Sequence, residues 1–177
     1  RRRKLEKIEE IEMRRERLAR KPLEIQGVFP WINMSEEEFK EKFEFTPITL
    51  NGKFDKSRYV FVQKTKENEP GYQLVNPFIL NNGSQVIVDR GWVPLDWNEI
   101  KGDLDEKEKL TSITGILYKG DKMNEYTKAS QSNIMVNMDT KEISKILQVD
   151  SDFIIKELGN DNKLYPKALR TTDLMTW

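Results

Sequence analysis

Apolar and polar residues alternate along several short segments of the chain, and this twofold period is typical of half-buried β-strands. Val, Ile, Thr, Phe and Tyr, which favour strands, are frequent in these segments. The pattern predicts six or seven strands, within residues 46–54, 58–63, 72–80, 85–90, 110–118, 133–138 and 151–156.

Turn residues separate several of these strands. Asn81-Asn82-Gly83-Ser84 predicts a tight hairpin, because Asn and Gly tolerate a positive φ. Glu69-Pro70-Gly71 predicts a turn just before the strand that begins at Tyr72. Pro94 is expected to end the strand that begins at Gln85, because proline cannot donate to a ladder. The polar segments 95–109 and 121–133 are expected to be surface loops.

Three segments have helical spacing instead. Residues 1–21 predict a highly charged helix that Pro22 ends. Ser35 forms a capping box with Glu38 and begins a short helix over about residues 36–43. Asp139 caps a third helix. The apolar residues of the first helix are Leu5, Ile8, Ile11 and Leu18, and those of the third are Ile143, Ile146 and Leu147.

These elements predict an α+β fold, which is mainly an antiparallel sheet or partly closed β-barrel with an N-terminal helical stalk and short flanking helices. The apolar strand faces must pack against one another, because three helices are too few to cover them. The chain therefore divides into a charged helix over residues 1–21 and a single β-rich domain over residues 22–169, followed by residues 170–177.

The amino-acid composition excludes several kinds of functional site. The 177 residues carry 30 Lys and Arg against 30 Asp and Glu, with no His and no Cys. This excludes disulfides, cysteine nucleophiles, zinc fingers and histidine general bases. A net charge of zero disfavours a dedicated nucleic-acid binder. No apolar run approaches the roughly 20 residues of a membrane-spanning helix.

The first helix has its own charge balance, because residues 1–21 hold ten basic and five acidic side chains. One interpretation is a solvated helix with a narrow contact seam. The other is a stalk beside anionic lipid head groups, which attract clustered basic residues.

No catalytic, metal or cofactor site is predicted. The paired carboxylates lie in charged surface runs, and glycine-rich phosphate loops and nucleophile elbows are absent from the sequence. The alternative to a protein-binding role is a small β-barrel module for single-stranded nucleic acid, which needs basic strands with exposed aromatic residues. Tyr59 and Phe61, with Arg58 and Lys64 nearby, are the best candidates for it, although alternating aromatic residues on a strand are more often core residues.

The most distinctive motif is Val86-Ile87-Val88-Asp89-Arg90-Gly91-Trp92-Val93-Pro94, preceded by Val75-Asn76-Pro77-Phe78. It resembles the surfeit locus protein 1 family of cytochrome c oxidase assembly factors. Further segments match that family in the same order and extend the resemblance to nearly the whole chain: Arg1–Lys4, Thr46–Asp55, Ile113-Thr114-Gly115, Asp139 and Thr176-Trp177.

The resemblance implies a non-catalytic assembly factor or accessory subunit of mitochondrial cytochrome c oxidase, supporting maturation of its haem-containing core subunit. It implies a domain between two membrane helices of the mitochondrial inner membrane that faces the intermembrane space. Residues 170–177 then lead into the second of these helices. The expected partners are oxidase core subunits, other inner-membrane proteins and membrane lipid near Arg1–Lys4, and no nucleic acid.

Within the motif, Arg90, Trp92 and Pro94 are the partner-binding candidates, because Arg and Trp are the usual anchors of interfaces. A purely structural interpretation stands beside this one, in which Gly91 permits a sharp strand exit and Trp92 fills the core.

The resemblance also bears on haem. The family has a His shortly before its Thr-Trp, and by count Arg170 stands there in this chain. Arginine has no lone pair for iron. Met135 and Met138 lie in a strand-like run, where packing is favoured over ligation. Haem held through an ordinary axial ligand is therefore not expected.

Overall fold

A computed structural model of the chain describes residues 2–97, 109–121, 132–159 and 165–170. The helices are α1 (Arg2–Leu18), α2 (Glu36–Lys42) and α4 (Thr140–Leu147). The strands are β1 (Leu23–Ile25), β2 (Pro47–Phe54), β3 (Val60–Lys66), β4 (Glu69–Leu80), β5 (Gln85–Pro94), β6 (Thr111–Tyr118), β7 (Ile134–Met135), β8 (Ile154–Gly159) and β9 (Leu169–Arg170). No helix among these residues is long and apolar enough to cross a membrane.

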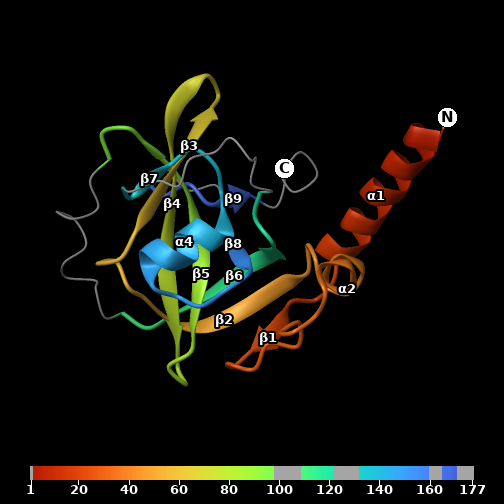
Figure 1. Ribbon diagram of the computed structural model, residues 1–177, viewed down its shortest axis with the longest axis horizontal. Helices are drawn as coiled ribbons and strands as arrows, with labels where there is room; N and C mark the ends of the chain where they lie inside the picture. Colours follow the sequence, from red (N-terminus) through yellow and green to blue (C-terminus); the bar gives the residue numbers. More distant parts are fainter. Residues whose placement is uncertain (1, 98–108, 122–131, 160–164, 171–177) are drawn as a thin grey trace.

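The strands form one large, mostly antiparallel sheet that curls on itself (Figure 1), which confirms the α+β expectation. Its order is β1-β2-β6-β8-β5-β4-β3-β7, and β2 also pairs with β4. This second pairing joins only Gly52–Phe54 to Phe78–Leu80. The sheet is therefore ring-like without being a true barrel. Gly52 allows the approach, because a Cβ there would lie 2.0 Å from the carbonyl oxygen of Ile79.

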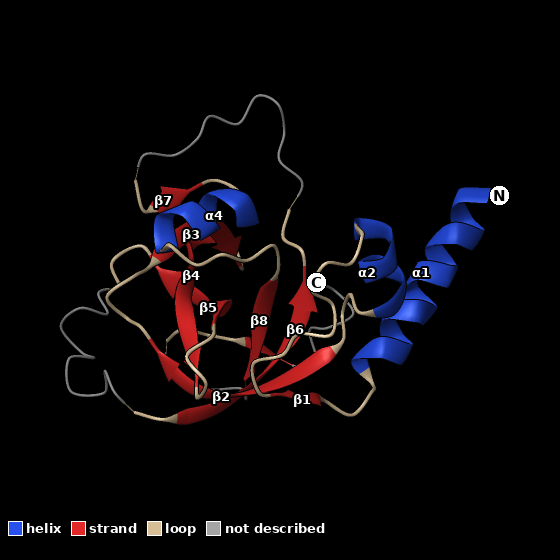
Figure 2. Cartoon of the chain, turned by 60° about the horizontal axis from the view of Figure 1, so that its bottom comes forward, coloured by secondary structure: helices blue, strands red, loops and turns tan. Residues whose placement is uncertain are grey.

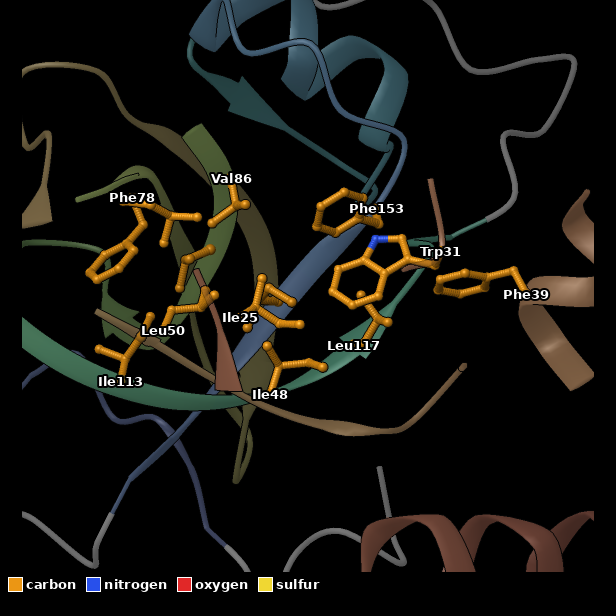
Figure 3. Packing of buried hydrophobic residues seen from close by; sticks show 13 residues of the cluster. Ile25, Trp31, Phe39, Ile48, Leu50, Phe78, Val86, Ile113, Leu117 and Phe153 are labelled. Atoms are coloured by element: carbon orange, nitrogen blue, oxygen red, sulfur yellow. The ribbon is translucent and has the colours of Figure 1, made fainter. Parts of the chain in front are cut away.

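Hydrophobic residues pack on both faces of the sheet. Val86 and Val88 belong to a cluster with Phe78, whereas Ile87 between them packs with Ile143 of α4. Side chains alternate between the faces of a strand, so the two clusters lie on opposite faces. Figure 3 shows the first cluster, in which Trp31 and Phe153 lie between the strands and Phe39 of α2. The second cluster lies beneath α4.

Both predicted helix caps are confirmed. The side chain of Ser35 accepts from the amide of Glu38, and the side chain of Asp139 accepts from the amides of Lys141 and Glu142. An N-cap of this kind satisfies amides that have no partner within the helix. The sequence therefore locates the start of α2 and the start of α4.

α1 projects away from the sheet and is attached near its C-terminal end (Figures 1 and 2). Leu5, Ile8 and Ile11 are 62%, 50% and 42% exposed, so this part of the expected seam of α1 is open to solvent in the described chain, whereas Leu18 is half-buried. Arg17 is only 3% exposed, and its guanidinium donates to the carbonyl oxygens of Lys40, Glu41 and Glu44. α1 is thus attached through the carbonyl end of α2.

Several boundaries differ from the prediction. The turn lies at Glu67 and Asn68, which both have a positive φ, whereas Glu69-Pro70-Gly71 belongs to β4. The expected strand over 133–138 is reduced to the two residues of β7, and β8 begins at Ile154. Parallel pairs also occur, between β1 and β2, β3 and β7, β5 and β8, and β8 and β9. Parts of the loops expected over 95–109 and 121–133 lie outside the described residues.

Candidate functional site

The Asp89–Pro94 segment of β5 contains a β-bulge. Asp89 pairs with Val75 of β4 and Gly91 pairs with Leu74, which leaves Arg90 as the extra residue. Gly91 has a φ of +120°, and its amide donates to the carboxylate of Asp89 over 3.0 Å. The strand therefore continues through Gly91 to Pro94, and the glycine permits a bulge instead of a strand exit.

The bulge sets which side chains share a face. Asp89 lies opposite Val75 and Trp92 lies opposite Gln73, two residues apart on β4. Residues two apart on a strand point to the same face, and directly opposed residues share it. Asp89 and Trp92, three residues apart, therefore share one face. In an unbulged strand they would lie on opposite faces.

Trp92 is held within the chain. It is 4% exposed, and its indole N–H donates to the carbonyl oxygen of Lys64 over 2.9 Å. The ring occupies the space that Gly71 leaves open, since a Cβ there would lie 2.5 Å from it. The backbone of Trp92 also pairs with that of Lys167 through bonds of 3.0 and 2.9 Å. The ring of Trp92 is therefore buried within the fold, as the structural interpretation of this residue expects.

Arg90 occupies a different environment. Its guanidinium lies 4.4 Å from the centre of the Phe54 ring and donates to the side-chain oxygen of Asn76 over 3.1 Å. Asn76 is buried and donates in turn to the carbonyl oxygen of Arg58 over 2.7 Å. Arg90 also lines a cavity of about 200 Å³ with Phe54, Lys56, Lys109 and Thr111.

The three partner-binding candidates are therefore not gathered into one patch. Trp92 lines a second cavity, of about 190 Å³, and Pro94 lines neither of the two. The assignment of Arg90, Trp92 and Pro94 to a partner surface stays a prediction.

The cavity beside Trp92 is strongly charged. Its charged lining residues are Lys64, Lys66, Asp89, Lys156, Glu157 and Lys167. Asp89 is buried, and burial raises the pKa of its carboxyl, although Lys156 opposes the shift. The ammonium of Lys156 lies 3.8 Å from the Asp89 carboxylate. Burial also raises the pKa of Glu157 to about 7, with Arg90 opposing the shift and Asp89 adding to it. This cavity could not be predicted from the sequence, because its lining residues come from β3, β4, β5, β8 and the segment that leads into β9.

Other candidate residues have structural partners. Arg58, considered for nucleic-acid binding, donates to Asp55, to the carbonyl oxygen of Leu147 and to Gln85, over 2.8, 2.8 and 2.6 Å. Met135 and Met138 are buried in the cluster beneath α4, as the packing interpretation predicts. Arg170 lies in β9. Among the described residues, no group of three or more carboxylates is placed to hold a metal ion.

Comparison with known proteins identifies relatives of this chain. The sequence model of the SURF1 family matches residues 1–175. A SURF1-like protein of Dictyostelium discoideum is 28% identical over 85 residues, which is 46% of this chain and 31% of that protein. The aligned region thus covers less than a third of that relative.

Proposed function

Because the chain belongs to the SURF1 (surfeit locus protein 1) family, we propose that it supports the assembly of cytochrome c oxidase as a non-catalytic binding protein. The observation that carries the proposal is the family match, which spans residues 1–175 and so includes the Arg90–Pro94 motif. The proposed client is the haem-containing core subunit, bound either transiently or as part of the finished complex.

The proposed location is the mitochondrial inner membrane, with the β-rich domain in the intermembrane space. The arrangement of α1 supports it. The helix projects from the sheet, and its first residues include Arg2, Arg3 and Lys4 (Figure 1). Basic residues at a helix end are attracted to anionic lipid head groups. α1 would then hold the domain at a distance of up to about 25 Å from the membrane, given 1.5 Å per helical residue.

The experiment deletes the gene in its own source cells and measures assembled cytochrome c oxidase on native gels, together with the haem a absorption band. Loss of the complex, restored by the wild-type gene, is the expected result. An unchanged oxidase level would refute the assembly role. Affinity purification then separates the two modes of action, because an accessory subunit co-migrates with the finished oxidase and an assembly factor with its precursors.

One substitution tests the motif. Arg90→Gln removes a cation from the cavity lined by Phe54, and Arg20→Gln is the matched control, because Arg20 is exposed and pairs only with Glu16 among the residues of the described chain. At equal protein abundance on immunoblots, Arg90→Gln should lower the oxidase level and Arg20→Gln should not. Equal oxidase levels in the two strains would remove Arg90 from the partner surface.

A further inference from the structure

Four lysines surround the cavity beside Trp92, although they are distant in the sequence. Lys64 and Lys66 come from β3, Lys156 from β8, and Lys167 from the segment that pairs with Trp92. The cavity measures about 190 Å³. The fold therefore brings four lysines into the lining of one cavity of small-molecule size.

The carboxylates nearby do not balance these charges. Asp89 already accepts from the amide of Gly91 over 3.0 Å and lies 3.8 Å from Lys156. Glu157, whose pKa is raised to about 7, is about half protonated at neutral pH. Within the described chain, no carboxylate lies in ion-pair contact with Lys64, Lys66 or Lys167. Four cations against two acids leave an excess of at least two positive charges.

The excess of positive charge in the cavity favours an anionic ligand. Lysine ammonium groups act as point charges with several donors, and they do not select the planar geometry that arginine favours. Several ammonium groups are best satisfied by a compact anion with many acceptor oxygens. A phosphate monoester carries about −1.5 to −2 at neutral pH and has three strong acceptor oxygens. The indole of Trp92 supplies an apolar wall for the carbon skeleton that bears the phosphate.

We propose that the cavity formed by Lys64, Lys66, Trp92, Lys156 and Lys167 binds a phosphate monoester. The source is either a soluble ester or the head group of a phospholipid such as phosphatidic acid, which presents the same chemistry. The site does not depend on the proposed role in oxidase assembly, because it follows from the charges and the cavity alone.

The test uses the 177-residue chain and three probes: inorganic phosphate, glycerol 3-phosphate, and phosphatidylcholine vesicles with or without phosphatidic acid. Calorimetry and vesicle co-sedimentation measure affinity at low salt, and nitrogen-edited NMR follows the Trp92 indole N–H. Lys64→Gln/Lys167→Gln removes two cavity charges. Lys42→Gln/Lys141→Gln is the control, because it removes two exposed lysines that lie outside the cavity.

Saturable binding is expected, with the affinity reduced about tenfold or more in Lys64→Gln/Lys167→Gln and less than about twofold in the control. Binding of glycerol 3-phosphate supports a soluble ester, and binding only to vesicles with phosphatidic acid supports a lipid head group. Should the double variant fail to fold, Lys167→Gln and the Trp92 indole shift in the wild type decide the question. Absence of binding to every probe, or equal losses in both double variants, would overturn the site.

Discussion

Replacing Gly91 with alanine adds a single Cβ atom to the bulge of β5. Gly91 has a φ of +120°, which side chains with a Cβ rarely adopt. An added Cβ would lie 2.3 Å from the carbonyl oxygen of Lys167 and 2.6 Å from the amide nitrogen of Ala168. These are backbone atoms, so no rotamer change relieves the contact. The segment at Lys167 must move away from β5.

Two contributions give the magnitude. Holding alanine at this φ costs about 1–2 kcal/mol. Moving the segment breaks the two backbone hydrogen bonds between Trp92 and Lys167, each worth about 0.5–1.5 kcal/mol. Gly91→Ala should therefore lower the free energy of unfolding by about 2–5 kcal/mol. The loss should be largest if the segment detaches completely.

Gly83→Ala is the matched control. Gly83 also has a positive φ, +89°, but no atom lies within 4 Å of its added Cβ. It should lose only the backbone contribution of about 1–2 kcal/mol. Urea denaturation measures both variants, and hydrogen exchange should show faster exchange of the Lys167 amide in Gly91→Ala alone. If Gly91→Ala loses no more stability than Gly83→Ala, the contact with residues 167 and 168 does not constrain the bulge.

Three further predictions use the same denaturation assays. Trp92→Ala should lower the unfolding free energy by about 3–5 kcal/mol, because it leaves a cavity where the buried ring was. An unchanged melting temperature would show that the ring is exposed. Arg17→Met should lower the unfolding free energy by about 1.5–3 kcal/mol, because it leaves the carbonyl oxygens of Lys40, Glu41 and Glu44 without their charged donor. Arg20→Met at the surface should change stability by less than about 1 kcal/mol, and equal losses in the two variants would refute the anchoring role of Arg17. Native Glu157 has a pKa of about 7, so it keeps a proton that the unfolded chain loses above the ordinary pKa of 4.5. Stability should therefore fall by up to about 3 kcal/mol as the pH rises from about 5 to about 7, and Glu157→Gln should flatten this slope. A slope that Glu157→Gln leaves unchanged would contradict the raised pKa of Glu157.

The sequence predicts the parts of the fold that depend on local chemistry. Ser35 and Asp139 cap their helices, and Gly83 turns the hairpin with a positive φ, as expected. The predicted turn at Glu69-Pro70-Gly71 is wrong. In the structure Pro70 pairs with Thr65, and the turn residues are Glu67 and Asn68. Proline is tolerated in that position near the strand end.

Pairings between distant segments could not be predicted in the same way. β1 has only three residues, too few for their alternation to predict a strand, and its place beside β2 depends on tertiary contacts. The Arg90–Pro94 motif was identified from its residues, but the bulge that puts Asp89 and Trp92 on one face depends on register with β4. The cavity beside Trp92 is lined by residues of both β3 and β8, which lie about ninety residues apart in the chain. No local sequence pattern predicts such a contact.

The short strands at the ends of the sheet bear on self-association. In the described chain the sheet ends in β1, with three residues, and β7, with two. Such short edges offer few unpaired backbone groups to a strand of another molecule. Beyond β7, the edge of β3 carries Lys64 and Lys66, and charged edge residues oppose strand addition. The chain should therefore resist edge-to-edge aggregation at high concentration, and loss of β7 would expose the edge where an added strand would first pair.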